Sequence, residues 1–264
     1  MRLKDKVAII VGGGQTPGET VGNGRATALV FAREGAKVLL VDRDSTTVEE
    51  TRKMIANEGG TASCFTADVT DEAACKSVID ACLEQFGRID ILHNNVGKSM
   101  GDAEVSAVEE AAWDSIFDLN LKSFAFMCKH VLPVMREQQE GVIINVSSIA
   151  SLCTVSGAAY KTSKASVNSL TQLLAVENGK HGIRVNAILP GLMDTPMAIE
   201  RRARERNVSR DTVRAERDRA VPLRKKMGSA WDVANAALFL AGEEASFVSG
   251  VCLPVDGAQS ARVG

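Results

Sequence analysis

The chain has 264 residues, of which 45% are apolar and 24% charged, so it can bury a sizeable core and one large domain is expected. A formal net charge of −2 argues against a general nucleic-acid binder. No apolar run approaches the about 18 residues of a membrane helix, and the N-terminus lacks a signal-peptide pattern, so we expect a cytoplasmic protein.

Short apolar runs alternate with helix-like segments along the chain. Val7–Val11 is wholly apolar, which is typical of a strand covered on both faces. Six more strands are predicted at Lys37–Val41, Thr61–Thr66, Ile89–Asn94, Val142–Ser147, Ile183–Leu189 and Val251–Val255. Helices are predicted before Gly35, from a cap at Ser45 to Gly59, and at Glu72–Phe86, Trp113–Val131, Ala158–Asn178 and Trp231–Leu240. The alternation predicts an α/β fold, a doubly wound seven-stranded parallel sheet with helices on both faces, in one domain spanning 1–264.

One region, Met197–Lys226, contains no strand pattern. It carries eleven basic and five acidic residues, a net charge of +6 in an otherwise acidic chain. We expect a helical excursion above the sheet that acts as a substrate lid over 197–226. The excess charge suggests an anionic substrate, and the alternative is a solvated helix face with Arg–Glu pairs.

A glycine-rich loop follows the first strand, from Gly12 to Gly24. Glycines let a backbone turn tightly against a pyrophosphate, and the next helix directs its amides at the anion. Asp42 ends the second strand, where a carboxylate can hold the adenosine ribose. Together these features predict a dinucleotide site, with a surface turn as the alternative role of Asp42.

Seven further motifs follow, each at the end of a predicted strand or on the next helix. They are Asp68-Val69, NNVG from Asn94 to Gly97, Asn120 in WDSIFDLN, NVSS ending at Ser148, YKTSK from Tyr160 to Lys164, PGLMDT from Pro190 to Thr195, and VDG ending at Gly257. With these motifs nearly the whole chain resembles the short-chain dehydrogenase/reductase family. The resemblance implies a Rossmann fold and an NAD(P)-dependent oxidoreductase of alcohols or ketones.

Tyr160 is the only tyrosine, and Lys164 lies one helical turn away on the same face. The lysine charge favours the phenolate, so Tyr160 can exchange a proton with a substrate oxygen as hydride moves to or from the cofactor. The resemblance implies that Lys164 also binds the nicotinamide ribose, that Ser148 polarises the substrate oxygen and that Asn120 holds a water. Ser148 is chosen because the loop from Ser151 is aligned as one residue short. Ser147, which lies the family's usual thirteen positions before Tyr160, is the alternative.

The resemblance also implies the cofactor contacts. These are expected from Gly12, Gly22, Asn23, Gly24, Asp42, Arg43, Asp68, Val69, Asn94, Gly97, Tyr160, Lys164, Pro190, Gly191, Met193 and Thr195. Asp42 should repel a 2′-phosphate, so NAD is expected over NADP, although Arg43 is a basic neighbour. A small-molecule alcohol or ketone is the expected substrate, and the family implies a homotetramer.

The glycine loop departs from the family pattern. Nine residues separate Gly12 from Gly22 where three are usual, an insertion of six near Gln15–Val21 that we expect beside the pyrophosphate or ribose, or as a solvent-exposed bulge. Long loops are typical of the enoyl-reductase branch, but that branch separates its tyrosine and lysine by six residues and this chain by three. We therefore favour alcohol–ketone chemistry. The alternatives are an NADP-dependent carbonyl reductase of the 3-oxoacyl type and a non-catalytic dinucleotide sensor.

Metal chemistry is not expected. The six cysteines and three histidines are scattered without ligand spacing, which favours reduced thiols. His93 stands where the family has an aliphatic residue, and we expect it to be packed or hydrogen-bonded.

Overall fold

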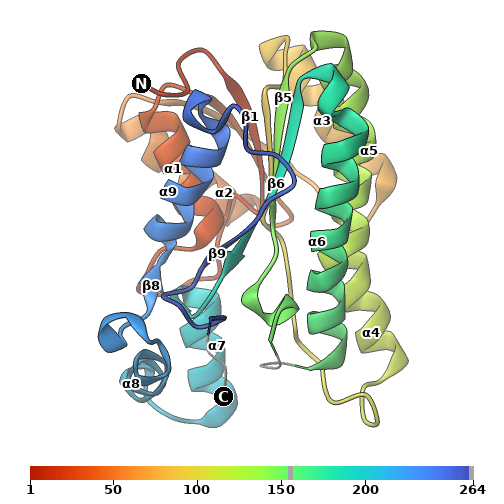
Figure 1. Cartoon of the computed structure of the whole chain (residues 1–264). Helices are drawn as coiled ribbons and strands as arrows, with labels where there is room; N and C mark the ends of the chain where they lie inside the picture. The colour runs from red at the N-terminus through yellow and green to blue at the C-terminus, as the bar shows by residue number, and fades with distance from the viewer. Residues whose placement is uncertain (154–156, 262–264) are drawn as a thin grey trace.

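The computed structural model describes residues 1–153 and 157–261. Seven parallel strands form one sheet in the order β3-β2-β1-β4-β5-β6-β9 (Figure 1). Their bounds are β1 Val7–Val11, β2 Lys37–Asp42, β3 Thr61–Thr66, β4 Ile91–Asn94, β5 Gly141–Val146, β6 Ile183–Pro190 and β9 Cys252–Val255. The predicted fold class is confirmed. The strand order reverses between β1 and β4, and ligands of open α/β sheets bind beyond the carboxyl ends of such strands.

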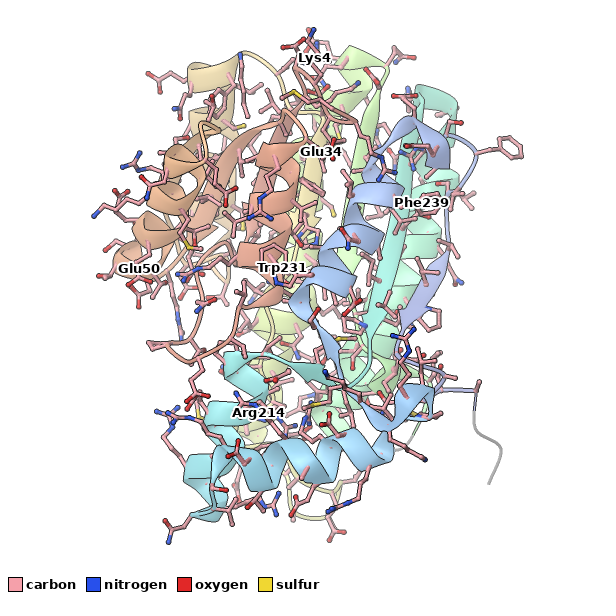
Figure 2. All side chains as sticks on the ribbon, turned by 90° about the vertical axis from the view of Figure 1, so that its left-hand side faces the viewer. Lys4, Glu34, Glu50, Arg214, Trp231 and Phe239 are labelled. Carbon is pink, nitrogen blue, oxygen red and sulfur yellow. The ribbon has the colours of Figure 1, made fainter. Side chains whose placement is uncertain are left out.

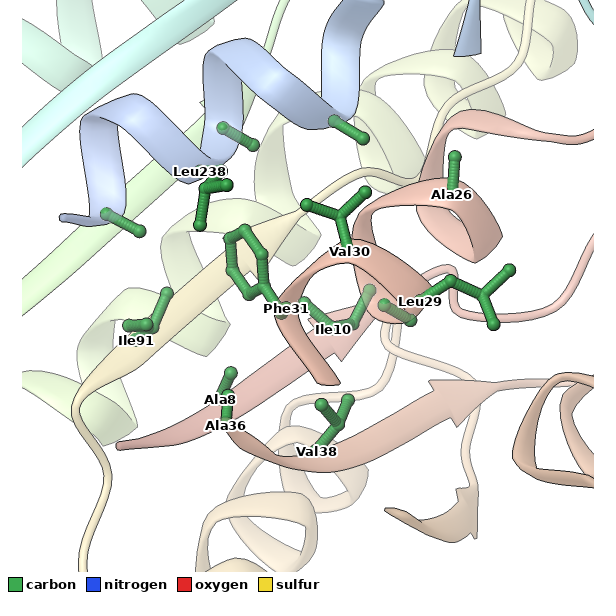
Figure 3. Packing of buried hydrophobic residues seen from close by; sticks show 14 of the residues in the cluster. Ala8, Ile10, Ala26, Leu29, Val30, Phe31, Ala36, Val38, Ile91 and Leu238 are labelled. Carbon is green, nitrogen blue, oxygen red and sulfur yellow. The ribbon is translucent and has the colours of Figure 1, made fainter. Parts of the chain in front are cut away.

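Three helices cover each face of the sheet (Figure 1). One layer holds α1 Asn23–Arg33, α2 Ser45–Asn57 and α9 Ala230–Ala241, and the other α3 Glu72–Phe86, α5 Ser123–Gln138 and α6 Ala158–Asn178. Strand β1 serves both layers, since Ala8 and Ile10 face the first and Val7, Ile9 and Val11 the second. Figure 3 shows the first layer, where Phe31 of α1 packs near Leu238 of α9 above the sheet.

Two helices differ from the sequence prediction. Asp44, and not Ser45, caps α2, because its carboxylate accepts hydrogen bonds from the amides of Thr46 and Thr47. The helix predicted over Trp113–Val131 is divided: α4 (Glu110–Phe117) passes through a π-helical turn, Asp118–Lys122, into α5. The π-helical turn covers only five residues and bonds residue i to i+5 within a stretch predicted as one helix, so the sequence pattern did not reveal it.

The region after β6 forms the expected helical excursion. It contains α7 (Pro196–Arg206) and α8 (Arg210–Ala220), which lie beyond the carboxyl end of the sheet (Figure 1). A parallel pair outside the main sheet, β7 (Met193–Asp194) with β8 (Gly228–Ser229), flanks the excursion. Its small apolar cluster is Ile199, Val213, Val221 and Met227.

Single-turn 3-10 helices complete the described chain at Ile149–Ser151, Gly179–His181, Leu223–Lys225 and Glu243–Ala245. In the described ranges, none of the helices has the length and apolar character needed to cross a membrane.

Candidate active site

The glycine loop is held by contacts that only glycine permits. Gly12 has a φ of +80°, and a Cβ on Gly24 would lie 1.9 Å from the carbonyl oxygen of Gly12. The side chain of Asn95, just after β4, donates to the same oxygen at 3.3 Å. The loop is therefore pressed against α1, as a pyrophosphate cradle requires. The sequence analysis did not assign Asn95, although its place in the NNVG motif was a signal.

The inserted residues bridge the glycine loop and the excursion. At the root, the Gln15 side chain accepts a hydrogen bond from the Gly22 amide at 2.9 Å and donates to the Thr20 carbonyl oxygen at 3.4 Å. At the tip, Glu19 pairs with Arg210 at 3.3 Å and Arg214 at 3.1 Å, both on α8. Figure 2 labels Arg214 on this part of the surface. The sequence prediction did not include this contact with the excursion.

The start of α1 fits a dinucleotide. Its N-cap is Gly22, which offers no capping side chain, so amides at this helix end are open to an anion. The side-chain oxygen of Asn23 is buried without a hydrogen-bond partner among the described residues, although a buried polar atom normally has one. A bound ligand or ordered water would satisfy it.

Asp42 lies beside this loop, at the end of β2. Its carboxylate accepts hydrogen bonds from the amides of Gly14 at 3.1 Å and Asp44 at 3.2 Å. The nearest cation of α1 points elsewhere: the buried Arg25 donates to the Thr47 carbonyl oxygen, the Thr51 hydroxyl and Glu50. Arg43 is exposed. A carboxylate therefore stands next to the loop, and the buried Arg25 nearby already donates to protein groups.

Asp68 and Val69 follow β3. Hydrogen bonds from the amide and hydroxyl of Thr70 hold the pKa of Asp68 below its usual range, and the charge of Arg43 contributes in the same direction. Val69 is buried in the second core layer.

Tyr160 and Lys164 lie on one face of α6. Lys164 is 3% exposed, its Nζ donates to the Val146 carbonyl oxygen at 2.8 Å, and burial lowers its pKa to about 7. Burial raises the pKa of Tyr160, whereas the Ser148 hydroxyl and the charges of Arg202 and Arg201 lower it. Burial thus moves the pKa of the amine toward neutral pH and that of the phenol away from it, so the Ser148 hydroxyl and the nearby positive charges are what favour ionisation of Tyr160.

The two candidate serines have different surroundings. Ser147 is 3% exposed, and its hydroxyl donates to the Lys164 carbonyl oxygen at 2.9 Å. Ser148 is less buried, accepts the Ala150 amide at 3.1 Å, and lies close enough to Tyr160 to affect the pKa of the phenol. Residues 154–156 of the loop that suggested Ser148 lie outside the described residues.

Asn120 occupies the π-helical turn and is fully buried. Its side chain accepts the Lys98 amide at 2.8 Å and donates to the Lys98 carbonyl oxygen at 2.9 Å and to the Ser163 hydroxyl at 3.1 Å. A Cβ on Gly97 would lie 3.3 Å from Lys164 Nζ and 3.5 Å from Asn120 Oδ1. Asn120 and Lys164 therefore converge on Gly97, and π-helical turns are frequent at functional sites.

Asp102, in the loop between β4 and α4, holds the start of α6. Its carboxylate accepts the amides of Ala159 at 3.0 Å and Tyr160 at 2.9 Å, while the N-cap residue, Gly157, has no side chain to do so. The sequence analysis missed Asp102, because its partners lie more than fifty positions away.

Asn94 and His93 lie inside the sheet. The Asn94 side chain donates to Asn145 of β5 at 2.9 Å, so its amide links two strands, and its Oδ1 is buried without a hydrogen-bond partner among the described residues. His93 is fully buried, packs edge-on against Phe31 at 6.3 Å, and burial lowers its pKa to about 4. It is packed rather than hydrogen-bonded through its ring in the described part of the chain.

The segment after β6 closes the candidate site. Pro190 ends the strand, and the Gly191 amide donates to the Val255 carbonyl oxygen at 3.0 Å. Met193, on β7, is 5% exposed, and Thr195, the N-cap residue of α7, is 6% exposed. The segment predicted to bind the nicotinamide thus leads directly into the excursion.

Known proteins resemble the chain over nearly its full length. A family model described as enoyl-(acyl carrier protein) reductase matches residues 19–258. Levodione reductase of Leifsonia aquatica is 35% identical over 263 residues, covering 98% of this chain and 96% of the relative. A solved structure of levodione reductase superposes with a TM-score of 0.93 at 34% identity, covering 99% of this chain and 100% of that one.

Two more proteins extend the comparison. The 2-(R)-hydroxypropyl-CoM dehydrogenase of Xanthobacter autotrophicus is 38% identical over 262 residues, covering 97% of this chain and 99% of the relative. The structure of a short-chain type dehydrogenase/reductase from Mycobacterium ulcerans has a TM-score of 0.88 at 29% identity, covering 100% of this chain and 93% of that one.

Proposed function

The chain belongs to the short-chain dehydrogenase/reductase family, and from this premise we propose that it oxidises a secondary alcohol with NAD, using Tyr160 as the acid–base group. It is an oxidoreductase that moves hydride between a nicotinamide dinucleotide and a small alcohol or ketone. The observation that carries the proposed site is the convergence of Tyr160, Ser148, Lys164 and Asn120 at the carboxyl end of β4 and β5.

The proton chemistry belongs to Tyr160. The bound nicotinamide supplies the hydride acceptor for oxidation and the hydride donor for reduction. As hydride leaves the carbinol carbon, the Tyr160 phenolate takes the hydroxyl proton, and in reduction it returns that proton. The Ser148 hydroxyl donates a hydrogen bond to the substrate oxygen and steadies its developing charge.

Lys164 and Asn120 support that step. The Lys164 ammonium favours ionisation of Tyr160, and it is proposed to exchange its bond with the Val146 carbonyl oxygen for one with the nicotinamide ribose. Asn120, fixed by Lys98 and Ser163, is proposed to hold the water that links Lys164 to solvent.

The acid–base assignment is tested with Tyr160→Phe, which keeps the ring and removes the proton donor. We expect turnover of a secondary-alcohol panel to fall at least ~10²-fold while NAD affinity changes little. Near-normal turnover would show that another group moves the proton. Ser147→Ala and Ser148→Ala form a matched pair, and we expect the larger loss of kcat in Ser148→Ala.

NAD preference rests on Asp42 and Arg25. The carboxylate beside Gly14 would repel a 2′-phosphate, and Arg25 is already bonded to Thr47, Thr51 and Glu50. We expect wild type to prefer NAD at least ~10-fold in kcat/KM, equivalent to ~1.4 kcal/mol, and Asp42→Ala to lose most of that preference. If wild type preferred NADP, the role of Asp42 would be overturned and Arg43 would be the group expected to bind the 2′-phosphate.

Alcohol–ketone chemistry is proposed rather than the enoyl reduction that the matching family model describes. Three residues separate Tyr160 from Lys164, one turn of α6, so both side chains share a face. An enoyl thioester consumed faster than any ketone would overturn this choice.

A homo-oligomer, expected as a tetramer, is also proposed. Leu173 and Val176 on α6 are 55% and 84% exposed, which supports association through this helix. Sedimentation of wild type against Val176→Lys tests it, with partial dissociation of the variant expected.

A further inference from the structure

Six of the nine arginines of the excursion fall into two groups of three. The outer group is matched by carboxylates: Arg206 with Glu216 at 2.6 Å, Arg210 with Glu200 at 2.8 Å, and Arg214 with Asp194 at 3.2 Å. Glu216 and Glu200 are already counted in the net charge of +6, so of these three carboxylates only Asp194, which precedes the excursion, offsets it further. The inner group is Arg201, Arg202 and Arg217.

Arg201 is the inner arginine that reaches across the site. Its two terminal nitrogens each lie 3.2 Å from the Ser99 hydroxyl, in the loop that carries Asp102. Its side chain is 24% exposed, and its Nε is buried with no hydrogen-bond partner in the described ranges. The nearest carboxylate, Glu205, is 3.6 Å from that Nε, beyond a hydrogen bond.

Arg202 and Arg217 are partly buried. In residues 1–153 and 157–261, neither guanidinium forms an ion pair, since no carboxylate oxygen lies within 4.0 Å of its nitrogens. Arg202 donates to the Ala198 carbonyl oxygen of its own helix. Arg217 donates to the Met227 sulfur at 3.3 Å and makes a long contact of 3.5 Å with the Met193 carbonyl oxygen. Most of their donor capacity is therefore unused.

The three guanidiniums influence one another, and Arg201 and Arg202 also act on Tyr160. Burial, with the charges of Arg202 and Arg201, lowers the pKa of Arg217 to about 10, against the opposing charges of Asp194 and Asp218. Burial also lowers the pKa of Arg202, with Arg201 acting in the same direction. Of the nearby acids, Asp194 pairs with Arg214, and Asp218 accepts the Met227 amide at 2.8 Å. Glu205, 3.6 Å from Arg201 Nε, is the one carboxylate paired with any of the three guanidiniums in the described ranges. Three partly desolvated like charges that share one carboxylate would be stabilised by a further counter-ion.

We propose that Arg201, Arg202 and Arg217 form a subsite for an oxyanion, a carboxylate or phosphate group that the substrate carries at a distance from its carbinol carbon. The inference rests on the proposed function, because it places this anion beside Tyr160. Guanidinium donors match the paired oxygens of such groups. The excursion then selects the substrate through charge as well as covering it.

Anion binding is tested without turnover, so that it can fail independently of the proposed chemistry. The probe is inorganic phosphate against chloride at equal ionic strength, with saturating NAD to fill the glycine loop, and the readout is the melting temperature. We expect phosphate to stabilise wild type and Tyr160→Phe alike, and Arg202→Gln and Arg217→Gln to lose at least half the shift. Arg204→Gln, an exposed neighbour on α7, is the matched control and should keep it.

Substrate choice is tested with hydroxy acids of increasing chain length, from 3-hydroxybutyrate to 5-hydroxyhexanoate, against their methyl esters. We expect kcat/KM to favour the acid at least ~10-fold at the length that reaches the arginines. That ratio should collapse toward one in Arg202→Gln and Arg217→Gln. Equal acid and ester rates at every length, or an unchanged phosphate shift in both variants, overturns the subsite. If no hydroxy acid reacts, the phosphate result alone decides.

Discussion

Asp102 is expected to stabilise the helix that carries Tyr160, and its replacement measures how much. The carboxylate accepts the second and third amides of α6, which an N-cap serine or aspartate would normally satisfy, from a different loop. Loss of a cap costs about 0.5–2 kcal/mol, and loss of a negative charge at a helix N-terminus costs about 0.3–1 kcal/mol. Asp102→Ala should therefore destabilise the protein by ~2 kcal/mol, and Asp102→Asn by ~1 kcal/mol.

The effect is measured by thermal unfolding at fixed protein concentration. For a domain of this size, ~2 kcal/mol corresponds to a fall in Tm of roughly 4–8 °C. Asp114→Ala is the control, because Asp114 is exposed and makes no side-chain hydrogen bond in the described part of the chain. We also expect kcat to fall more than NAD affinity in Asp102→Ala, since the Tyr160 amide is one of the released groups.

A second substitution tests the geometry itself. A Cβ on Gly157 would lie 2.3 Å from the Asp102 carboxyl carbon, so Gly157→Ala must displace the carboxylate. Once Asp102 is alanine, the added methyl has nothing to displace. The two losses should therefore be far from additive. Additive losses, or an Asp102→Ala protein that melts with wild type, would refute the capping role.

Three other predictions concern packing and ionisation. Gly24→Ala should destabilise the protein by ~1–3 kcal/mol and weaken NAD binding, because its Cβ would lie 1.9 Å from the Gly12 carbonyl oxygen. The control is Gly179→Ala, which has open space around its Cβ and should leave stability unchanged or raise it. Calorimetry measures the stability of both variants, and titration with NAD measures binding. Lys164 has a pKa of about 7 in the folded protein and ~10.4 in the unfolded chain. Between these pH values the unfolded chain binds more protons, so the free energy of unfolding should rise by up to ~1.4 kcal/mol for each pH unit. Denaturant titrations of Lys164→Met from pH 7 to 9 should lack this contribution, and identical slopes in both proteins would contradict it. The charge of Arg202 lowers the pKa of Tyr160. Arg202→Gln should therefore move the midpoint of the pH profile of alcohol oxidation to higher pH. An unchanged midpoint would show that Arg202 does not act on the ionisation of Tyr160.

Most of the sheet could be predicted from the sequence because its strands are short apolar runs between turn signals, although half of the residues of Thr61–Thr66 are polar. Thr61–Thr66 and the helices Glu72–Phe86 and Ala158–Asn178 agree with the prediction residue for residue. The site motifs could be placed because parallel strands bring their carboxyl ends to one edge. Their catalytic and cofactor roles stay predictions.

Features that depend on tertiary contacts could not be predicted. The Asp102 cap joins residues 57 and 58 positions apart, and local pattern carries no signal for such a pair. The π-helical turn at Asn120 spans only Asp118–Lys122, within a stretch predicted as one helix. Which arginines of α7 and α8 form ion pairs with carboxylates depends on the direction in which each side chain points.

The ion pairs of Glu19 with Arg210 and Arg214 join the glycine-loop insertion to the excursion, although the two lie far apart in the sequence. In an engineered protein the two stretches would have to be replaced together. Substrate range in an enzyme of this kind is most simply altered by grafting a new excursion between β7 and β8. Here such a graft would strip Glu19 of Arg210 and Arg214 and leave Gly18 facing a different helix surface, since its Cβ position lies 2.8 Å from Pro196 and Glu200. A working chimera must therefore inherit the glycine-loop insertion together with the excursion, so the two segments are redesigned as a pair.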